Sequence, residues 1–286
     1  MKSIFIKLLI ALPVIYLALF AGLWSSVTDS RPMLSLLDMM RSDSATEIID
    51  FSSDEEKSSR PKPKPNKDRN PYYGDLHVHT KHSFDAYIFG VTATPNDAYR
   101  YAKGEGIMHP MGYEMKLQEP LDFYSVTDHG FFMGMLNAWA DTSTDISQKD
   151  FAKPFHDLNE IENITPESAG PRSALFSTIL GGTITEPYSD LSPNVLKAWL
   201  TKNTQVALRS FDYEIHKSAW EDVAKAANEH NDPGHFTTFI GYEFTTSTNI
   251  EGGNLHRNVI FNSSKAPIRP WTRIDSINPE DLWTWQ

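Results

Sequence analysis

The chain of 286 residues contains no cysteine. This absence excludes disulfides, thiolate zinc sites, cysteine nucleophiles and an acylated N-terminal cysteine. It does not decide the compartment, because a chain without thiols suits oxidising and reducing spaces alike. At this length the chain holds one large domain or two modest ones.

Basic residues are also scarce: 26 Lys and Arg stand against 37 Asp and Glu, which gives a formal net charge of −11. Neutralising the phosphates of a nucleic acid needs clustered Lys and Arg, so this balance argues against a nucleic-acid partner. An acidic protein still binds anionic substrates where metal ions supply positive charge locally.

Three common functional motifs are missing. The sequence has no Gly-x-x-x-x-Gly-Lys-Ser/Thr phosphate loop, no Gly-x-Ser-x-Gly elbow and no His-Glu-x-x-His helix. The adjacent glycine pair Gly252-Gly253 leads into a predicted strand and not a helix. It therefore predicts a turn and not a cradle for phosphate.

The N-terminus carries the longest apolar run, residues 8–24, after a short basic start that includes Lys2 and Lys7. We interpret residues 1–26 as a signal peptide or a membrane anchor. A cleavable signal ends with small residues one and three positions before the cut, and no position near the end of this run has both. This favours an uncleaved anchor. The preceding lysines should stay in the cytoplasm, so we expect an extracytoplasmic protein, either membrane-anchored or periplasmic and secreted.

Residues 27–71 have the composition of a disordered tether, rich in Ser, Asp, Glu, Lys and Pro. Near its end, Arg60-Pro-Lys-Pro-Lys-Pro65 should be extended as polyproline II, because each proline restricts φ and lacks a backbone donor. We place the globular domain at residues 72–286.

Strands and helices alternate along this domain. Four apolar, β-branched or aromatic segments predict strands at residues 73–80, 121–127, 236–244 and 255–262. Helix signals occur at Thr94–Asp97, 131–140, 193–200, the Ser218–Glu221 capping box and 279–286. This alternation predicts an α/β fold with parallel strands.

His77-Val78-His79 lies inside the first predicted strand. Side chains at positions i and i+2 of a strand point to the same face, so both imidazoles can reach one metal ion. With 10 histidines in 286 residues, however, a His-x-His arises by chance in roughly a third of such chains. The pair alone therefore decides little.

Further candidate ligands end the later predicted strands. Asp128-His129 ends the second strand and Glu243 the third, whereas His256 falls at the start of the fourth and is an exception. In α/β sheets and barrels, functional side chains gather at the carboxyl ends of strands. Such residues are rarely buried without partners, so packing explains them poorly.

Several neighbouring residues have two interpretations. Asp75 is a turn residue or a partner of an imidazole, and Asp85 can swing its carboxylate into the same site. Arg257 contacts an anionic substrate or forms a salt bridge on the rim. We interpret His82 as an exposed loop residue. The remaining histidines are interpreted as loop, surface or capping residues: His109, His156, His216, His230 and His235.

Two segments together, Asp75-Leu-His-Val-His-Thr80 and Leu121-Asp-Phe-Tyr-Ser-Val-Thr-Asp-His129, resemble the polymerase-and-histidinol-phosphatase (PHP) superfamily of metal-dependent phosphoesterases. Tyr72 to His77, Gly241 to Thr245 and Gly252 to Phe261 resemble more narrowly an uncharacterised branch of it, a domain of unknown function. The resemblance implies a distorted (β/α)7 TIM-like barrel with up to three divalent metal ions at the strand ends.

The resemblance also implies roles for individual residues. His77 and His79 would ligate one ion, with Asp85 at a further acidic position. His129 would ligate the next ion, Glu243 would bridge two ions, and His256 would be another ligand. Asp128 fits a place behind the ligands. We take Glu243, Asp128 and Arg257 as the candidate catalytic residues.

Family members carry a later histidine and a final Asp-x-His, and nothing after His256 supplies them. We therefore expect an incomplete barrel and a chain truncated at its C-terminus.

The leading hypothesis is hydrolysis of a small phosphorylated substrate by a metal-activated hydroxide. Histidine and carboxylate ligands suit Zn, Mn or Fe. Among enzymatic activities, hydrolysis of an amide or a lactone at a similar site is the alternative to phosphate-ester hydrolysis. A non-catalytic exported protein that binds metal or a partner is the alternative outside them, and an inactive fragment is a third possibility.

Overall fold

A computed structural model of the chain describes residues 45–52, 66–179, 211–247, 254–275 and 278–286. Within these ranges, no helix is both long and apolar enough to cross a membrane. Four predictions fall outside the described residues: the N-terminal apolar segment, the polyproline II segment at 60–65, the helix at 193–200 and the Gly252-Gly253 turn.

A three-stranded parallel sheet forms the centre, in the order β2 (Gly74–Val78), β5 (Phe123–Val126), β6 (Thr237–Thr238). These strands confirm the prediction of a mixed α/β fold with parallel pairing. Gly74 is paired with Phe123, and a Cβ atom at Gly74 would collide with the Phe123 carbonyl oxygen and ring. The close approach of β2 to β5 therefore requires glycine at this position.

The third predicted strand is interrupted at Phe239, between β6 and β7 (Ile240–Ser247). The Phe239 carbonyl accepts a hydrogen bond from Ser125 Oγ (3.0 Å). Beyond this break, β7 stays beside β5 through a parallel bridge between His129 and Glu243.

β7 pairs antiparallel with β8 (Asn254–Phe261) over its whole length, from Ile240↔Phe261 to Ser247↔Asn254. The fourth predicted strand therefore exists, but it does not run parallel to the third. The described strands form separate small sheets and no closed barrel, so the prediction of an incomplete seven-stranded barrel is not confirmed.

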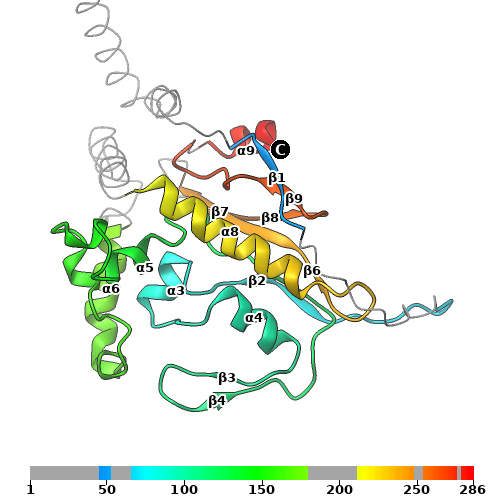
Figure 1. Cartoon of the computed structure of the whole chain (residues 1–286), viewed down its shortest axis with the longest axis horizontal. Coiled ribbons are helices and arrows are strands. Elements are labelled where there is room, and N and C mark those ends of the chain that lie inside the picture. The colour runs from blue at the N-terminus through cyan, green and yellow to red at the C-terminus, as the bar shows by residue number, and fades with distance from the viewer. Residues whose placement is uncertain (1–44, 53–65, 180–210, 248–253, 276–277) are drawn as a thin grey trace, which may run out of the picture.

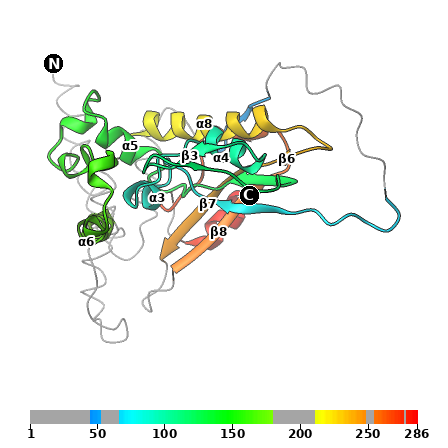
Figure 2. The same ribbon diagram turned by 90° about the horizontal axis from the view of Figure 1, so that it is seen from below.

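Two helices cover one face of the sheet (Figures 1 and 2). α4 (Pro95–Ala102) begins at the predicted capping box, in which Thr94 and Asp97 bond each other's backbone N–H groups. α8 (Tyr213–His230) begins earlier than predicted, because Asp212 accepts from two N–H groups of its first turn. The Ser218–Glu221 pattern thus lies within a helix that had already begun.

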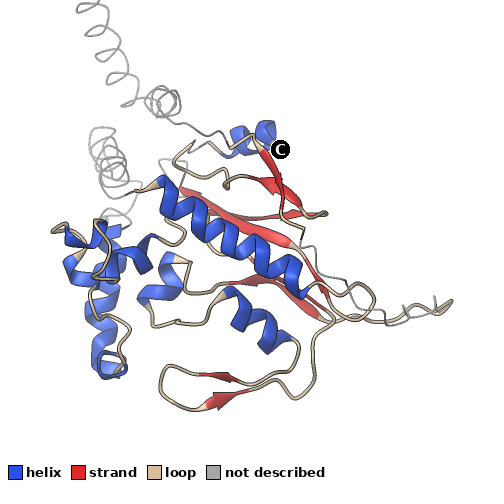
Figure 3. Cartoon of the chain, viewed as in Figure 1, coloured by secondary structure: helices blue, strands red, loops and turns tan. Residues whose placement is uncertain are grey.

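A helical cluster lies at one end of the molecule (Figure 3). Its helices are α3 (Phe84–Ile88), α5 (Met135–Ala140) and α6 (Ala169–Ile179). The predicted helix at 131–140 is shorter than expected because Gly134 has a φ of 73° and breaks it. The remaining short elements are β3 (Ile107–Met108), β4 (Glu114–Met115), four 3-10 turns (Ile146–Gln148, Lys153–Phe155, Ile161–Asn163, Pro166–Ser168) and α9 (Pro279–Trp285).

Part of the segment predicted as a tether is packed against the domain. β1 (Ile48–Asp50) pairs antiparallel with β9 (Lys265–Pro267). The next side chain, Phe51, is buried edge-on against Trp220. The packed structure therefore begins before residue 72.

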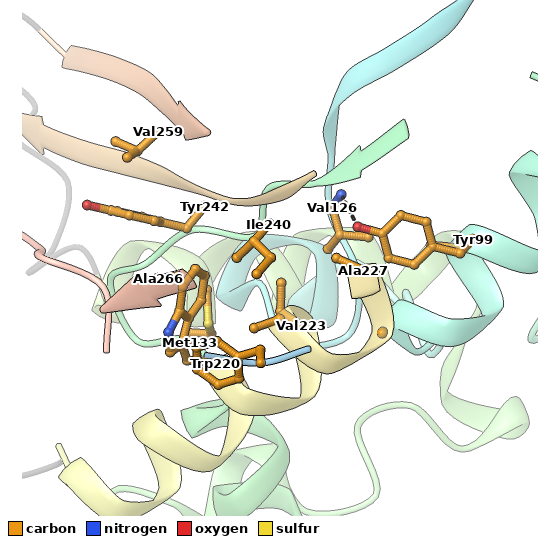
Figure 4. Close-up of a cluster of buried hydrophobic side chains, with 14 of the residues drawn as sticks. Tyr99, Val126, Met133, Trp220, Val223, Ala227, Ile240, Tyr242, Val259 and Ala266 are labelled. Carbon is orange, nitrogen blue, oxygen red and sulfur yellow. Dashed lines mark hydrogen bonds between the residues drawn. The ribbon is translucent and has the colours of Figure 1, made fainter. Parts of the chain in front are cut away.

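Trp220 of α8 is the largest fully buried side chain in the cluster between helix and sheet (Figure 4). Its Nε1 donates to the Pro267 carbonyl (2.7 Å), and its ring meets Tyr242 of β7 edge-on. One side chain thus joins α8, β7 and β9, and it holds β7 in the position that the site requires.

We predict that Trp220→Ala lowers the free energy of unfolding by about 3–5 kcal/mol, because it leaves a cavity and an unpaired carbonyl. Chemical denaturation measures the change. Trp283→Ala is the matched control, since Trp283 is 57% exposed, and it should change stability by less than about 0.5 kcal/mol. Equal losses for the two variants would contradict this view of the core.

Candidate metal centre

Glu243 is the residue on which the other site residues converge. Its Oε2 lies 3.0 Å from His77 Nε2 and 2.9 Å from His79 Nε2, and its Oε1 contacts His256 Nδ1. His129 Nδ1 lies 3.6 Å from Oε2. The carboxylate is only 1% exposed. A buried carboxylate is strongly unfavourable without compensation, so these imidazoles are its necessary partners.

Asp85 supplies a second carboxylate on the other side of two of these rings. It belongs to α3, and its oxygens lie 3.4 Å from His79 Nδ1 and 3.4 Å from His129 Nε2. The two rings are 4.6 Å apart at their centroids. The predicted swing of Asp85 toward the site is therefore present in the structure.

The six predicted ligands form three overlapping groups, in each of which the donor atoms lie close enough together to hold one metal ion. They are His77–His79–Glu243, His79–Asp85–His129 and His129–Glu243–His256, each with ligand atoms within 4.8 Å of one another. Imidazole nitrogen and carboxylate oxygen are a donor set that Zn, Mn or Fe can use. The donor groups therefore fit divalent metal ions, and their chemistry does not choose between these three.

Exposure is uneven across the site. His129 is 6% and His79 18% exposed, whereas His256 is 39% and His77 59% exposed. The centre is thus closed on the side of His129 and open on the side of His77 and His256. A substrate can reach it from that open side.

The position of His256 at the start of its strand is explained by the β7–β8 hairpin. Antiparallel pairing places the beginning of β8 beside the end of β7, and His256 lies opposite Thr245. Cross-strand partners share a face, so His256 lies on the face that carries Glu243. The exception in the sequence pattern is thus a consequence of one chain reversal.

Asp128 supports the site from behind. Its oxygens accept hydrogen bonds from the Thr80 backbone N–H (2.5 Å) and hydroxyl (2.6 Å), and its own carbonyl accepts from Glu243 N–H (2.9 Å). It is fully buried, and this burial raises the pKa of its carboxyl group. These contacts join β2, β5 and β7 and match the supporting place that the family resemblance implies.

Arg257 is not brought to the site. Its backbone pairs with Phe244, so it lies on the opposite face of the hairpin from Glu243 and His256. Its side chain is exposed, and Nη1 donates to the His256 carbonyl (2.7 Å). The structure therefore offers no support for the predicted contact with an anionic substrate.

Two histidines differ from their predicted environments. His82, predicted to be exposed, is 7% exposed, and its Nε2 lies 3.5 Å from Asp222. His216, predicted to be a surface or capping residue, is 1% exposed, and its Nε2 contacts the Gly130 carbonyl (2.7 Å). Both predictions were wrong, because the packing of α5 and α8 around these segments is not visible in local spacing.

Sequence reasoning missed two buried hydroxyls. Ser83 Oγ contacts His79 Nδ1 (2.7 Å), and Thr245 Oγ1 contacts His129 Nδ1 (2.6 Å). Thr245 was detectable, because it lies two residues after Glu243 in a strand and shares its face. Nothing in the local sequence marked Ser83 beyond its place between the two ligands His79 and Asp85.

The charges of the centre are strongly coupled. Burial opposes a charged His79, but hydrogen bonds to Asp85 and Glu243 outweigh it and raise the pKa of His79 to about 10. Burial likewise opposes ionised Glu243, but His79, His129 and His256 lower its pKa to about 2. Without metal, the site therefore holds at least one proton in place of a cation.

The chain belongs to the DUF3604 family of proteins of unknown function, whose family model matches residues 66–286. This match confirms the part of the resemblance that concerned an uncharacterised domain. No curated protein and no solved structure matches the chain.

We predict that the metal-free protein loses stability as pH rises from about 6.5 to about 10. The pKa of His79 is raised on folding, so its contribution is complete below the unfolded pKa and disappears as pH passes the folded value. Chemical denaturation in a chelator measures the slope. His79→Gln should flatten it, and saturating Zn²⁺ should replace the proton and protect the wild type at high pH. An unchanged slope in His79→Gln would contradict this assignment.

Proposed function

We propose that this protein is a metal-dependent hydrolase that acts on a small phosphate ester. One observation carries the proposal: a buried carboxylate, Glu243, meets four histidines that three different strands and their ends supply. Histidine–carboxylate clusters at the carboxyl ends of parallel strands are typical of hydrolytic metal centres.

Six residues would hold the metal ions: His77, His79, Asp85, His129, Glu243 and His256. A bound divalent ion would lower the pKa of a coordinated water toward neutrality and stabilise the charge that develops on phosphoryl oxygens. Glu243 presents one oxygen to His77 and His79 and the other to His256, so it separates two groups of nitrogen donors.

An anionic substrate suits this centre despite the acidic chain. The net charge of −11 repels phosphate in general, so local positive charge has to compensate for it at the binding site. The open side is lined by the predicted metal ligands His77 and His256, whose imidazoles carry no negative charge. His129 and Asp128 lie on the closed side and exclude water there.

We also propose that the centre is of the PHP type. All six ligand positions that the resemblance implies converge in the described structure, and their order along the chain is the order of the superfamily motifs. A distorted barrel with parallel strands around such a centre is the fold that this proposal implies, and the parallel order β2-β5-β6 is compatible with it.

The test is metal content and turnover in Glu243→Gln and His77→Ala. Both variants should lose bound metal, and hydrolysis of a panel of phosphomonoesters and phosphodiesters should fall by more than ~100-fold, since loss of even an outer partner costs roughly 10–100-fold. His230→Ala is the matched control, because His230 contacts Asn96 and Tyr99 away from the site, and it should retain metal and turnover.

Three outcomes would contradict parts of the proposal. Metal binding without turnover of phosphate esters, amides or lactones would contradict the enzyme and favour a metal-binding protein. Turnover of amides or lactones alone would contradict the phosphate ester as substrate. Absence of metal from the purified wild type after incubation with Zn²⁺, Mn²⁺ or Fe²⁺ would contradict both the metal-dependent hydrolase and the metal-binding protein.

We propose in addition that the chain is exported and works outside the cytoplasm. The basic start and the apolar run at residues 8–24 support this. A reporter that is active only outside the cytoplasm, fused after Gln286, should be active with the whole chain and inactive after deletion of residues 1–26. Equal reporter activity in both fusions would contradict export by this segment.

A further inference from the structure

Two buried hydroxyls lie against the same ring atom of two predicted ligands. Ser83 Oγ is 2.7 Å from His79 Nδ1, and Thr245 Oγ1 is 2.6 Å from His129 Nδ1. Ser83 is fully buried and Thr245 is 6% exposed. In both rings the other nitrogen, Nε2, faces a carboxylate: Glu243 for His79 and Asp85 for His129.

Ser83 uses its hydroxyl in an unusual way. It is the N-cap residue of α3, a position where serine normally accepts hydrogen bonds from the first helical turn, yet its side chain makes no such bond. Instead its oxygen accepts from the His129 backbone N–H (3.2 Å) and its proton is donated to Asp85 Oδ1 (2.5 Å). The hydroxyl therefore contacts residues of the candidate metal centre and not the first turn of α3.

Proton accounting then determines the tautomer of His79. A serine hydroxyl has one proton, and here Asp85 receives it. At His79 Nδ1 the Ser83 oxygen can only accept, so the ring proton of His79 must be on Nδ1. In the metal-free protein Nε2 carries the second proton, 2.9 Å from Glu243 Oε2. When that proton leaves, the lone pair of the neutral ring is on Nε2, beside His77 Nε2.

A hydroxyl, Thr245 Oγ1, also lies against His129, but none of its contacts among the described residues is to a carboxylate that takes its proton, so the Nδ1 proton of His129 is part of the proposal. His129 Nδ1 makes the shorter of the two imidazole contacts of Thr245, 2.6 Å against 3.4 Å to His256. With the proton of His129 on Nδ1, the lone pair of Nε2 faces Asp85 Oδ2 at 3.4 Å. Two ligands of a tetrahedral ion with bonds of about 2.0–2.1 Å are separated by about 3.3–3.4 Å, so this spacing suits a shared ion.

We propose that Ser83 and Thr245 are positioning residues that hold His79 and His129 as their Nδ1–H tautomers and thereby assign Nε2 of each ring to metal. The inference rests on the proposed metal centre but not on its substrate. It also divides the overlapping donor groups: His79 serves the ion at Glu243 and His77, and His129 serves a separate ion at Asp85. A neutral imidazole has one lone pair, so neither ring serves both.

Zn²⁺ affinity in Ser83→Ala and Thr245→Val, measured on the full chain by competition with a chelator, tests the proposal. Each variant removes a hydroxyl with little change of volume and should weaken Zn²⁺ binding by roughly 10–100-fold. Thr245→Ser keeps the hydroxyl and should retain wild-type affinity. Ser125→Ala is the fold control, because Ser125 is equally buried but donates to the Phe239 carbonyl.

Nitrogen NMR of the histidine rings gives a readout that a purely structural role would not change. In the Zn²⁺-loaded wild type, His79 and His129 should show a protonated Nδ1 and a metal-bound Nε2, and the variants should lose this pattern at the affected ring. Assignment uses His79→Gln and His129→Gln.

Wild-type affinity in both hydroxyl variants, or a protonated Nε2 in either ring, would overturn the proposal. Equal loss in Thr245→Ser and Thr245→Val would overturn it as well, because the hydroxyl would then be irrelevant. Failure to hydrolyse phosphate esters, with Zn²⁺ binding weakened as expected, would reject the proposed substrate and leave the positioning roles supported.

Discussion

The structure around the centre depends on the burial of one carboxylate, Glu243, beside the end of β5. An ionised group at 1% exposure is tolerated only with several close partners. Those partners come from β2 and the residue after it, from the segment that follows β5 and from β8, so the relative positions of four chain segments depend on a single side chain. The backbone reinforces this arrangement, because Glu243 N–H donates to the Asp128 carbonyl and Gly130 N–H donates to the Glu243 carbonyl.

Around this carboxylate the site is built in layers. Histidines contact it directly, hydroxyls of Ser83 and Thr245 contact the outer nitrogens of two rings, and Asp128 anchors the turn after His79 through Thr80. The ring of Trp220 on α8 packs edge-on against Tyr242 of β7. The geometry of the candidate site therefore depends on core packing, since movement of β7 would displace Glu243.

The predictability of each residue follows from the range of the interaction that places it. His77 and His79 share a face because strand alternation is local, and their metal-binding role became credible once Glu243 and His129 were seen to end later strands. His256 appeared misplaced because β8 runs antiparallel to β7, which brings the start of β8 beside the end of β7. The burial of His82 and His216 arises from helices that pack across them, which local composition does not record.

The sequence by itself determined the four main strand segments, the capping of α4 and the set of six candidate ligands, because strand periodicity, cap chemistry and residue type are local properties. Tertiary structure alone decided that β8 returns antiparallel, that Arg257 faces away, that part of the predicted tether pairs with β9, and that two unremarkable hydroxyls touch the imidazoles. These outcomes depend on contacts between residues far apart in the sequence, such as Ile48 and Pro267, which are 219 positions apart. No local pattern encodes which distant surfaces meet.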